Sequence, residues 1–437
     1  MKVVLLATYE MGRQPFGLAS PAAWLREANH EVTLADVSTG PFPREVVADA
    51  DLVGFYLPMH TATRLAVPLI KKTRALNPKA QVCAFGLYAP LNETMLRECG
   101  VDVVLGGEFE ADLTALASGV VRVPDALPKL QFRVPDRAGM APLEKYTGLE
   151  ILGETRPVGY TEASRGCLHL CRHCPVVPVN QGQFRVVQPE VVLADIRQQV
   201  EAGARHITFG DPDFLNGPAH AMRIVEALHR EFPNVTYDAT IKVEHLLRHR
   251  RLIPVLKETG CLFITTAVES LDDRVLDKLE KNHTRRDFEE AANLFREHAL
   301  TLAPTFIAFT PWTTIASYRE LLSTLARLDL VESTASIQLA LRLLVTANSR
   351  LLDLDEVRSR VTGFDAAGLV HRWSHADPAV DVLANSALHL VDREQKDGNS
   401  RSGVFEKLWG LVNDGPLDNF KLMPRATVPY LNEPWYC

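Results

Sequence analysis

Short apolar runs alternate with longer amphipathic stretches along most of this 437-residue chain. In the amino-terminal quarter, the apolar runs are residues 2–8, 31–36, 51–57, 81–85 and 101–105. Amphipathic stretches follow at residues 21–28, 61–76, 91–99 and 110–117. This alternation is typical of a parallel sheet with crossover helices. We therefore predict an α/β fold in which residues 1–122 form a Rossmann-like domain.

A second series of strand patterns recurs about every 30–35 residues, a spacing typical of βα barrels. The six predicted strands are residues 158–163, 206–210, 236–240, 262–268, 302–308 and 336–341. Eight units close a complete barrel. Six units over residues 157–349 therefore predict a partial (β/α)6 barrel.

The two remaining segments lack such a repeat. Residues 123–156 contain several prolines and no sustained period, which predicts a linker. Residues 350–437 contain helix patterns at 365–372, 378–396 and 402–413. We expect this mainly helical C-terminal segment to cover the open side of the barrel.

Composition and charge exclude several classes of protein. Hydrophobic residues make up 46% and charged residues 23% of the chain, as in ordinary globular proteins. The formal net charge of -7 argues against nucleic-acid binding, which requires clustered basic residues. The first apolar run is too short for a signal peptide, and no other run reaches the about 18 residues of a membrane span. We expect a cytoplasmic protein whose seven cysteines stay reduced.

Three of those cysteines, Cys167, Cys171 and Cys174, share one short segment, SRGCLHLCRHCP. A four-iron cluster that only carries electrons uses four Cys thiolates. Three thiolates would leave one iron open to a small molecule. The alternative is a structural zinc site in a non-catalytic protein, completed by His169 or His173. Structural zinc usually takes four ligands, however, and the other cysteines are scattered.

The other predicted barrel strands end in acidic and hydroxyl-bearing segments. Gly210 and Asp211 follow the second strand, and Glu269 and Ser270 follow the fourth. Side chains at the carboxyl ends of barrel strands meet at one face. There they could accept hydrogen bonds from the ammonium and ribose hydroxyl groups of a zwitterionic cosubstrate.

The three-cysteine segment resembles the motif of radical S-adenosylmethionine (SAM) enzymes. The resemblance implies a 4Fe–4S cluster on the three cysteines, with SAM chelating the open iron and being cleaved to a 5′-deoxyadenosyl radical. An electron donor such as flavodoxin or ferredoxin is implied as partner. His173 matches the position of an aromatic residue beside the adenine. Gly210 and Asp211 match the contact to the methionyl amino group, and Glu269 and Ser270 match the nucleoside contact, with Ala267 in place of the usual glycine.

The order of domains resembles that of radical SAM enzymes with a cobalamin-binding domain, over about residues 1–350. The implied cobalamin contacts are Met59, Thr61, Thr63, Gly86, Gly106, Gly107 and Glu108. The motif Asp-x-His-x-x-Gly, whose histidine ligates cobalt in methyltransferase-type domains, is absent, and residues 9–16 contain no histidine. Either cobalamin binds without a protein nitrogen on cobalt, or the domain kept its fold and lost its ligand.

The resemblance extends to a subgroup whose tail reads Cys-Cys-Ala-Glu-Pro, or has selenocysteine as its second residue. Residues 304–314 and 434–437 resemble that subgroup, which predicts that the gene continues past Cys437 through a selenocysteine codon. The alternative is a plain terminus with one ordinary cysteine. The implied reaction is methylation of an unactivated carbon. A radical rearrangement or oxidation, with cobalamin in a redox role or absent, is the alternative. The substrate could be a small molecule, a lipid or a peptide.

Overall fold

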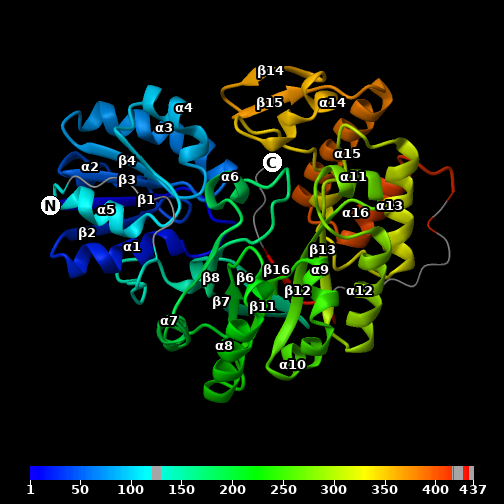
Figure 1. Ribbon diagram of the computed structural model, residues 1–437, viewed down its shortest axis with the longest axis horizontal. Helices are drawn as coiled ribbons and strands as arrows, with labels where there is room; N and C mark the ends of the chain where they lie inside the picture. The colour runs from blue at the N-terminus through cyan, green and yellow to red at the C-terminus, as the bar shows by residue number, and fades with distance from the viewer. Residues whose placement is uncertain (121–128, 416, 418–426, 433–437) are drawn as a thin grey trace.

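The computed structural model describes residues 1–120, 129–415, 417 and 427–432. Two bodies built on parallel strands lie beside each other, the amino-terminal one in blue and the barrel in green and yellow (Figure 1). The predicted α/β class is confirmed.

The amino-terminal domain is a parallel sheet in the order β2-β1-β3-β4-β5. Its strands are β1 (Lys2–Ala7), β2 (Glu31–Asp36), β3 (Leu52–Tyr56), β4 (Gln81–Phe85) and β5 (Val103–Leu105). Its helices are α1 (Phe16–Glu27), α2 (Arg44–Ala48), α3 (His60–Leu76), η1 (Pro90–Asn92), α4 (Glu93–Glu98) and α5 (Glu110–Ala117). Alternate β1 residues enter opposite cores, Val3 and Leu5 in one and Val4 and Leu6 in the other. Helices therefore cover both faces of the sheet.

This strand order places a crevice at a defined point. The direction of winding reverses between β1 and β3, and ligands of such sheets bind beyond the strand ends at that reversal. The loops at that point, residues 8–15 and 57–59, face the barrel.

The second sheet has the order β13-β12-β11-β10-β7-β6-β16. Five strands are parallel: β7 (Glu154–Thr161), β10 (His206–Phe209), β11 (Thr236–Thr240), β12 (Cys261–Glu269) and β13 (Thr301–Phe306). Two antiparallel strands, β6 (Gly148–Ile151) and β16 (Tyr430–Leu431), extend the β7 edge. A separate antiparallel pair is β8 (Ser164–Gly166) and β9 (Phe184–Val186).

Helices follow the barrel strands as predicted for βα units. They are α6 (Val176–Asn180), α7 (Pro189–Glu201), α8 (Pro218–Glu231), α9 (Val243–Arg248), α10 (Ile253–Glu258), α11 (Asp273–Lys278), α12 (Arg285–Glu297) and α13 (Ile315–Arg327). Short 3₁₀ turns are η2 (Leu143–Lys145), η3 (Phe214–Asn216), η4 (Arg250–Leu252), η5 (Ser336–Leu339) and η6 (Arg350–Asp353).

The sixth barrel position differs from the prediction. Residues 336–341 were expected as a strand, but η5 occupies 336–339, and a single parallel bridge joins Phe309 to Arg342. The side-chain oxygen of Gln338 accepts a hydrogen bond from the Phe306 backbone N–H at 3.1 Å. A side chain thus satisfies the edge of β13 that a sixth strand would have paired.

The predicted linker, residues 123–156, contains regular structure near its end. Residues 148–151 form β6, and β7 starts at Glu154, before the predicted start at residue 158. Leu152 and Gly153 have φ values of 51° and 79°, as a two-residue hairpin turn requires. Residues 121–128 lie outside the described part of the chain.

The C-terminal segment packs on the barrel through α15 (Pro378–Lys396) and α16 (Arg401–Trp409). Val380, Ala387 and Phe405 share a buried cluster with barrel residues. The short helix α14 (Asp355–Arg358) precedes them.

The predicted helix at 365–372 is wrong, because these residues lie in a hairpin of β14 (Val361–Asp365) and β15 (Val370–Trp373). The Asp365 carboxylate accepts hydrogen bonds from the backbone N–H groups of Ala367 and Gly368, each at 3.0 Å, which closes the turn. The hairpin contacts the amino-terminal domain, where His60 Nε2 bonds to the Gly368 carbonyl oxygen.

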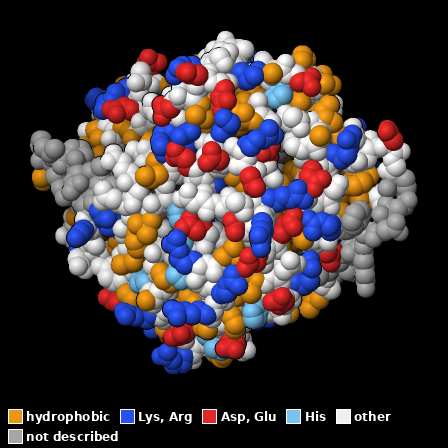
Figure 2. Space-filling view, turned by 45° about the vertical axis from the view of Figure 1, so that its right-hand side comes forward, with side chains coloured by type: hydrophobic (Ala, Val, Ile, Leu, Met, Phe, Trp, Pro, Cys, Tyr) orange, Lys and Arg blue, Asp and Glu red, His pale blue; other side chains and the backbone are white. Residues whose placement is uncertain are grey.

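Two features of the surface bear on partners. No described helix combines the length and apolarity needed to cross a bilayer. Figure 2 shows Lys and Arg side chains interspersed with Asp and Glu over the visible face, without a broad field of one sign.

Candidate functional site

The three-cysteine loop lies between β8 and α6, at the carboxyl end of β7. Gly166 starts the loop with a φ of 75°, and a Cβ there would lie 2.4 Å from the Gln183 carbonyl oxygen. The Cys174 N–H donates to the Cys171 carbonyl oxygen at 3.1 Å, which closes a tight turn. Cys167, Cys171 and Cys174 are free thiols. The loop thus presents three sulfur donors from one short segment.

The surroundings of these thiols suit a bound cation. Burial, together with the neighbouring Cys171 and Cys167, raises the pKa of Cys174 to about 12. Burial also raises the pKa of Cys167. The ammonium group of Lys242 lies 3.7 Å from Cys171 Sγ. Three neighbouring thiolates can form together only if positive charge compensates them, and a metal cluster supplies that charge.

His173 and Glu269, predicted on separate strand ends, meet beside the loop. Glu269 Oε1 lies 3.1 Å from His173 Nε2 and 3.2 Å from Lys281 Nζ. Burial alone would raise the pKa of Glu269, but Lys281 and His173 hold it well below its ordinary value. Glu269 has a φ of 69° at a register shift in β12. The Ser270 hydroxyl accepts a hydrogen bond from the Asp272 N–H at 3.1 Å.

Gly210 and Asp211 contact the residues that lead into the cysteine loop. The Asp211 carboxylate accepts hydrogen bonds from the Ala163 N–H at 3.0 Å and from the Ser164 hydroxyl, and burial raises its pKa to about 6. A Cβ on Gly210 would lie 1.9 Å from Tyr160 Oη. Glycine is therefore required there by the Tyr160 ring. Contact of either residue with a methionyl group stays a prediction.

A cavity of about 470 Å³, here called the interdomain cavity, joins the amino-terminal domain to the cysteine loop. His173 and Pro175 line it from the loop, and Met59 and Thr61 line it from the region after β3. Its other lining residues are Tyr9, Met11, His60, Arg64, Tyr88, Ile307, Ala340, Leu341, Arg342, Leu343, Leu344, Thr346 and Leu388.

A second cavity of about 220 Å³, here called the charged cavity, also lies between the domains. Four predicted cobalamin contacts line it: Met59, Gly86, Gly107 and Glu108. Two further predicted contacts, Thr63 and Gly106, line neither cavity and instead make local contacts. The Thr63 hydroxyl donates to the Met59 carbonyl oxygen at 3.0 Å, and a Cβ on Gly106 would lie 2.7 Å from Pro90.

Arg165 anchors the wall of the charged cavity and was not predicted from the sequence. Its guanidinium forms ion pairs with Glu108 at 2.8 Å, Glu110 at 2.6 Å and Glu162 at 2.7 Å. Burial raises the pKa values of Glu108 and Glu162 to about 7, whereas Arg165 and Ser20 offset burial and lower the pKa of Glu110. Glu108 and Glu110 belong to the amino-terminal domain, so this network joins the two domains.

A partial barrel with three cysteines after its first parallel strand faces a doubly wound domain. The family model "Radical SAM superfamily" matches residues 161–324. Hopanoid C-3 methylase from Methylococcus capsulatus is 27% identical over 320 residues, which cover 68% of this chain and 62% of that protein. The chain thus spans a little over three fifths of that relative.

Two solved structures share the fold. The cobalamin-dependent S-adenosylmethionine radical enzyme OxsB has a TM-score of 0.72 at 14% identity, covering 90% of this chain and 67% of that one. The radical S-adenosylmethionine methyltransferase TsrM from Kitasatospora setae has a TM-score of 0.61 at 16% identity, covering 75% and 70%. Residues 161–324 thus match the radical SAM superfamily model, and the fold of the chain is similar to that of these two cobalamin-dependent enzymes.

Proposed function

We propose that this chain is a cobalamin-dependent radical SAM methyltransferase acting on an unactivated carbon. The observation that carries the proposal is the interdomain cavity, where residues after β3 and residues of the cysteine loop line one space. A methyl donor held by one domain and a radical generated at the other could reach the same substrate there. The name of the hopanoid C-3 methylase relative agrees with methyl transfer to carbon.

At the loop, Cys167, Cys171 and Cys174 would hold a 4Fe–4S cluster with one open iron. Bound there, the cluster and SAM supply the electron and the 5′-deoxyadenosyl group for hydrogen abstraction. Lys242 and Lys281 place positive charge beside the thiols. The Lys281 ammonium is buried, and although burial lowers its pKa, Glu269 and the thiols raise it above its ordinary value, so the residue stays protonated.

His173 and Glu269 would position the nucleoside. Lys281 and the imidazole fix the Glu269 carboxylate in its ionised form, ready to accept hydrogen bonds. An external donor such as flavodoxin or ferredoxin would supply the electron.

At the other domain, Met59, Thr61, Gly86 and Gly107 would contact the corrin, because they lie at the carboxyl edge of the sheet and line the two cavities. The loop after β1 carries no histidine. His60 lines the interdomain cavity, but its Nε2 is bound to the Gly368 carbonyl oxygen. Cobalamin held without a protein nitrogen on cobalt therefore fits these residues.

The cavity walls favour a substrate with an apolar body. Ile307, Leu341, Leu343 and Leu388 line the side opposite the amino-terminal domain. Removing such side chains from water on binding stabilises a complex by roughly 25 cal/mol per Å² of apolar surface.

Anaerobic reconstitution tests the proposal. Wild type treated with iron, sulfide and hydroxocobalamin should absorb near roughly 400 nm and retain cobalamin on gel filtration. Supplied with reduced flavodoxin as electron donor, it should convert SAM to both 5′-deoxyadenosine and S-adenosylhomocysteine. Cys171→Ala should lose the absorbance and the nucleoside, while Cys99→Ala, a thiol in the amino-terminal domain, should keep both. Formation of 5′-deoxyadenosine alone would favour rearrangement or oxidation. A colourless zinc-loaded protein would contradict the enzyme.

A further inference from the structure

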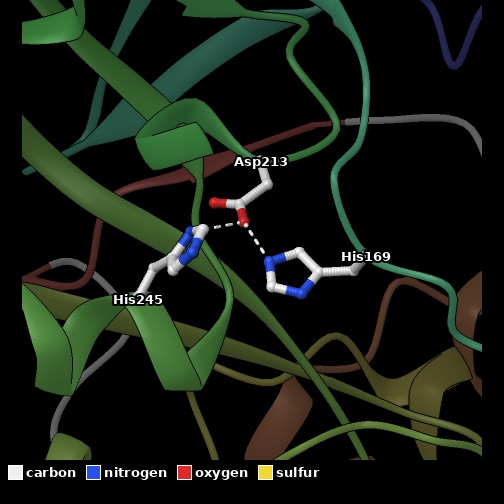
Figure 3. Close-up of side chains that lie close together, drawn as sticks. All are labelled: His169, Asp213 and His245. Carbon is white, nitrogen blue, oxygen red and sulfur yellow. Dashed lines mark ion pairs between the residues drawn. The ribbon is translucent and has the colours of Figure 1, made fainter. Parts of the chain in front are cut away.

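We propose that His169, Asp213 and His245 form a second metal site, for a divalent first-row transition ion such as zinc, beside the cysteine loop. His169 lies in that loop, Asp213 follows β10, and His245 lies on α9 (Figure 3). The proposal goes beyond the proposed function, because the site uses none of the three thiols and could exist with or without the iron–sulfur cluster.

The ligand atoms converge on one point. Asp213 Oδ2 lies 2.7 Å from His245 Nδ1 and 3.3 Å from His169 Nε2, and all three atoms are within 4.8 Å of one another. Tetrahedral metal bonds of about 2.0–2.2 Å place ligand atoms roughly 3.3–3.6 Å apart. The two imidazoles would need to move closer together, and Asp213 Oδ2 slightly away from His245 Nδ1, for the three atoms to share an ion.

The same atoms are buried without hydrogen bonds. Exposed side-chain fractions are 9% for His169, 0% for Asp213 and 5% for His245. Within the described residues, His169 Nε2, Asp213 Oδ2 and His245 Nδ1 have no partner in hydrogen-bond geometry. The two imidazoles reach Asp213 only through ion-pair contacts, so a bound cation would give all three buried atoms a well-directed partner.

The Glu244 carboxylate lies near the second ring nitrogen of His169. Its Oε2 lies 3.6 Å from His169 Nδ1, the ring nitrogen on the side away from Asp213. Its Oε1 accepts from Arg248 at 2.6 Å, which holds the carboxylate in place. Histidines that ligate metals usually direct their second nitrogen to a carboxylate, which fixes the tautomer and the ring orientation.

Charge and ligand type select the ion. Asp213 and Glu244 contribute two negative charges and Lys242, whose Nζ lies 3.9 Å from Glu244, contributes one positive charge. A divalent ion would turn this net negative cluster positive by one. Two imidazoles with one carboxylate suit zinc or ferrous iron rather than calcium or magnesium, which prefer oxygen ligands. Such a site would tie the cysteine loop to the loop after β10 and to α9.

Metal analysis of the full-length protein tests the site. Wild type and the Cys167→Ala/Cys171→Ala/Cys174→Ala variant, equilibrated with zinc and desalted, should each retain about one zinc per chain. Asp213→Asn and His245→Ala, made in the triple-cysteine background, should weaken zinc binding more than about 100-fold, and Glu244→Gln should weaken it about 10–100-fold. His389→Ala, at an exposed position of α15, should change nothing.

X-ray absorption at the zinc edge keeps the test decisive if a variant folds poorly. In wild type it should report nitrogen and oxygen ligands only. Sulfur at about 2.3 Å would place the zinc on the cysteines and overturn the proposal. Failure of the triple-cysteine variant to retain either zinc or ferrous iron would also overturn it. If that variant retains ferrous iron more tightly, iron is the ion. Each result is independent of SAM cleavage, so failure of this site would leave the proposed enzyme standing.

Discussion

Glu162 shows how a single buried acid can make stability depend on pH. Burial raises its pKa to about 7, although Arg165 lies 2.7 Å away. The carboxyl group has an ordinary pKa near 4.5 in the unfolded chain. Between these values the folded state holds a proton that the unfolded state has lost. The contribution of Glu162 to the free energy of unfolding is therefore fully present below about pH 4.5 and declines as pH rises toward 7.

We expect Glu162→Gln to reduce this decline. Each retained proton lowers the free energy of unfolding by at most about 1.4 kcal/mol per pH unit. The variant should lose less stability than wild type between pH 5.5 and 7.5, as measured by urea unfolding at both values. Glu231→Gln, on an exposed carboxylate, serves as control. Parallel pH dependence in wild type and Glu162→Gln would show that Glu162 is already ionised at pH 5.5.

At Gly210 the expected effect is steric. A methyl group there would lie 1.9 Å from Tyr160 Oη, so Gly210→Ala must displace the ring and should cost about 1–3 kcal/mol of stability. Gly40→Ala, whose new Cβ would meet nothing closer than 3.8 Å, should cost little. Thermal unfolding compares the two. If Tyr160→Leu in the same chain does not restore stability, the clash with Tyr160 is not the cause.

The three cysteines could be predicted from the sequence because their spacing alone sets them on one loop. The contact between His173 and Glu269, and the contact of Glu269 with Lys281, could not be predicted. Glu269 and Lys281 are distant in sequence from His173, and they reach it only when β12 is placed beside the loop. Residues 433–437, which carried the prediction about the chain's continuation, lie outside the described part.

Among the elements, α12 has a clear local start signal. The Thr284 side chain accepts from the Asp287 N–H, and the Asp287 carboxylate accepts from the Thr284 N–H, forming a capping box. Thr284→Ala should destabilise the protein by about 1 kcal/mol, whereas Thr284→Ser should be nearly neutral. Urea unfolding measures both. Equal destabilisation by Ala and Ser would point to the lost methyl group rather than to the cap.

Helices and strands with a clear hydrophobic period were predicted well. Turns held by hydrogen bonds from a side chain to the backbone were not. The strand at 31–36, the strand at 81–85 and the helix at 110–117 match the structure at both ends. The hairpin at 361–373 and the turn η5 depend on Asp365 and Gln338 bonding to backbone groups. Such contacts compete with regular hydrogen bonding and leave no periodic pattern in the sequence.

At the scale of the whole molecule, the contact between the domains depends on Arg165. Arg165→Leu would leave Glu108 and Glu110 buried without a cation, which should cost about 3–5 kcal/mol. Arg197→Leu, which breaks an exposed pair with Glu231, should cost at most about 1 kcal/mol. Calorimetry should show one transition for wild type and a lower or split transition for Arg165→Leu. An unchanged transition would show that the domains are held by other contacts.

The amino-terminal domain and the barrel, and their order along the chain, could be predicted from the alternation of strand and helix patterns. Their relative placement could not, because it depends on side chains from segments that are distant in the sequence. Arg137, in the predicted linker, pairs with Asp195 at 2.8 Å and bonds to Gln14 at 2.6 Å. No local pattern distinguishes such an arginine from a solvated one.

The position of Arg165 in the chain has a mechanical consequence. Only one residue separates Arg165 from Cys167. The ion pairs to the amino-terminal domain and the cysteine loop are therefore joined by about 7 Å of backbone at most. A shift of one domain relative to the other would therefore also move the cysteine loop. A barrel produced without the amino-terminal domain would keep its sheet but lose the ion pairs that fix the position of its three sulfur atoms.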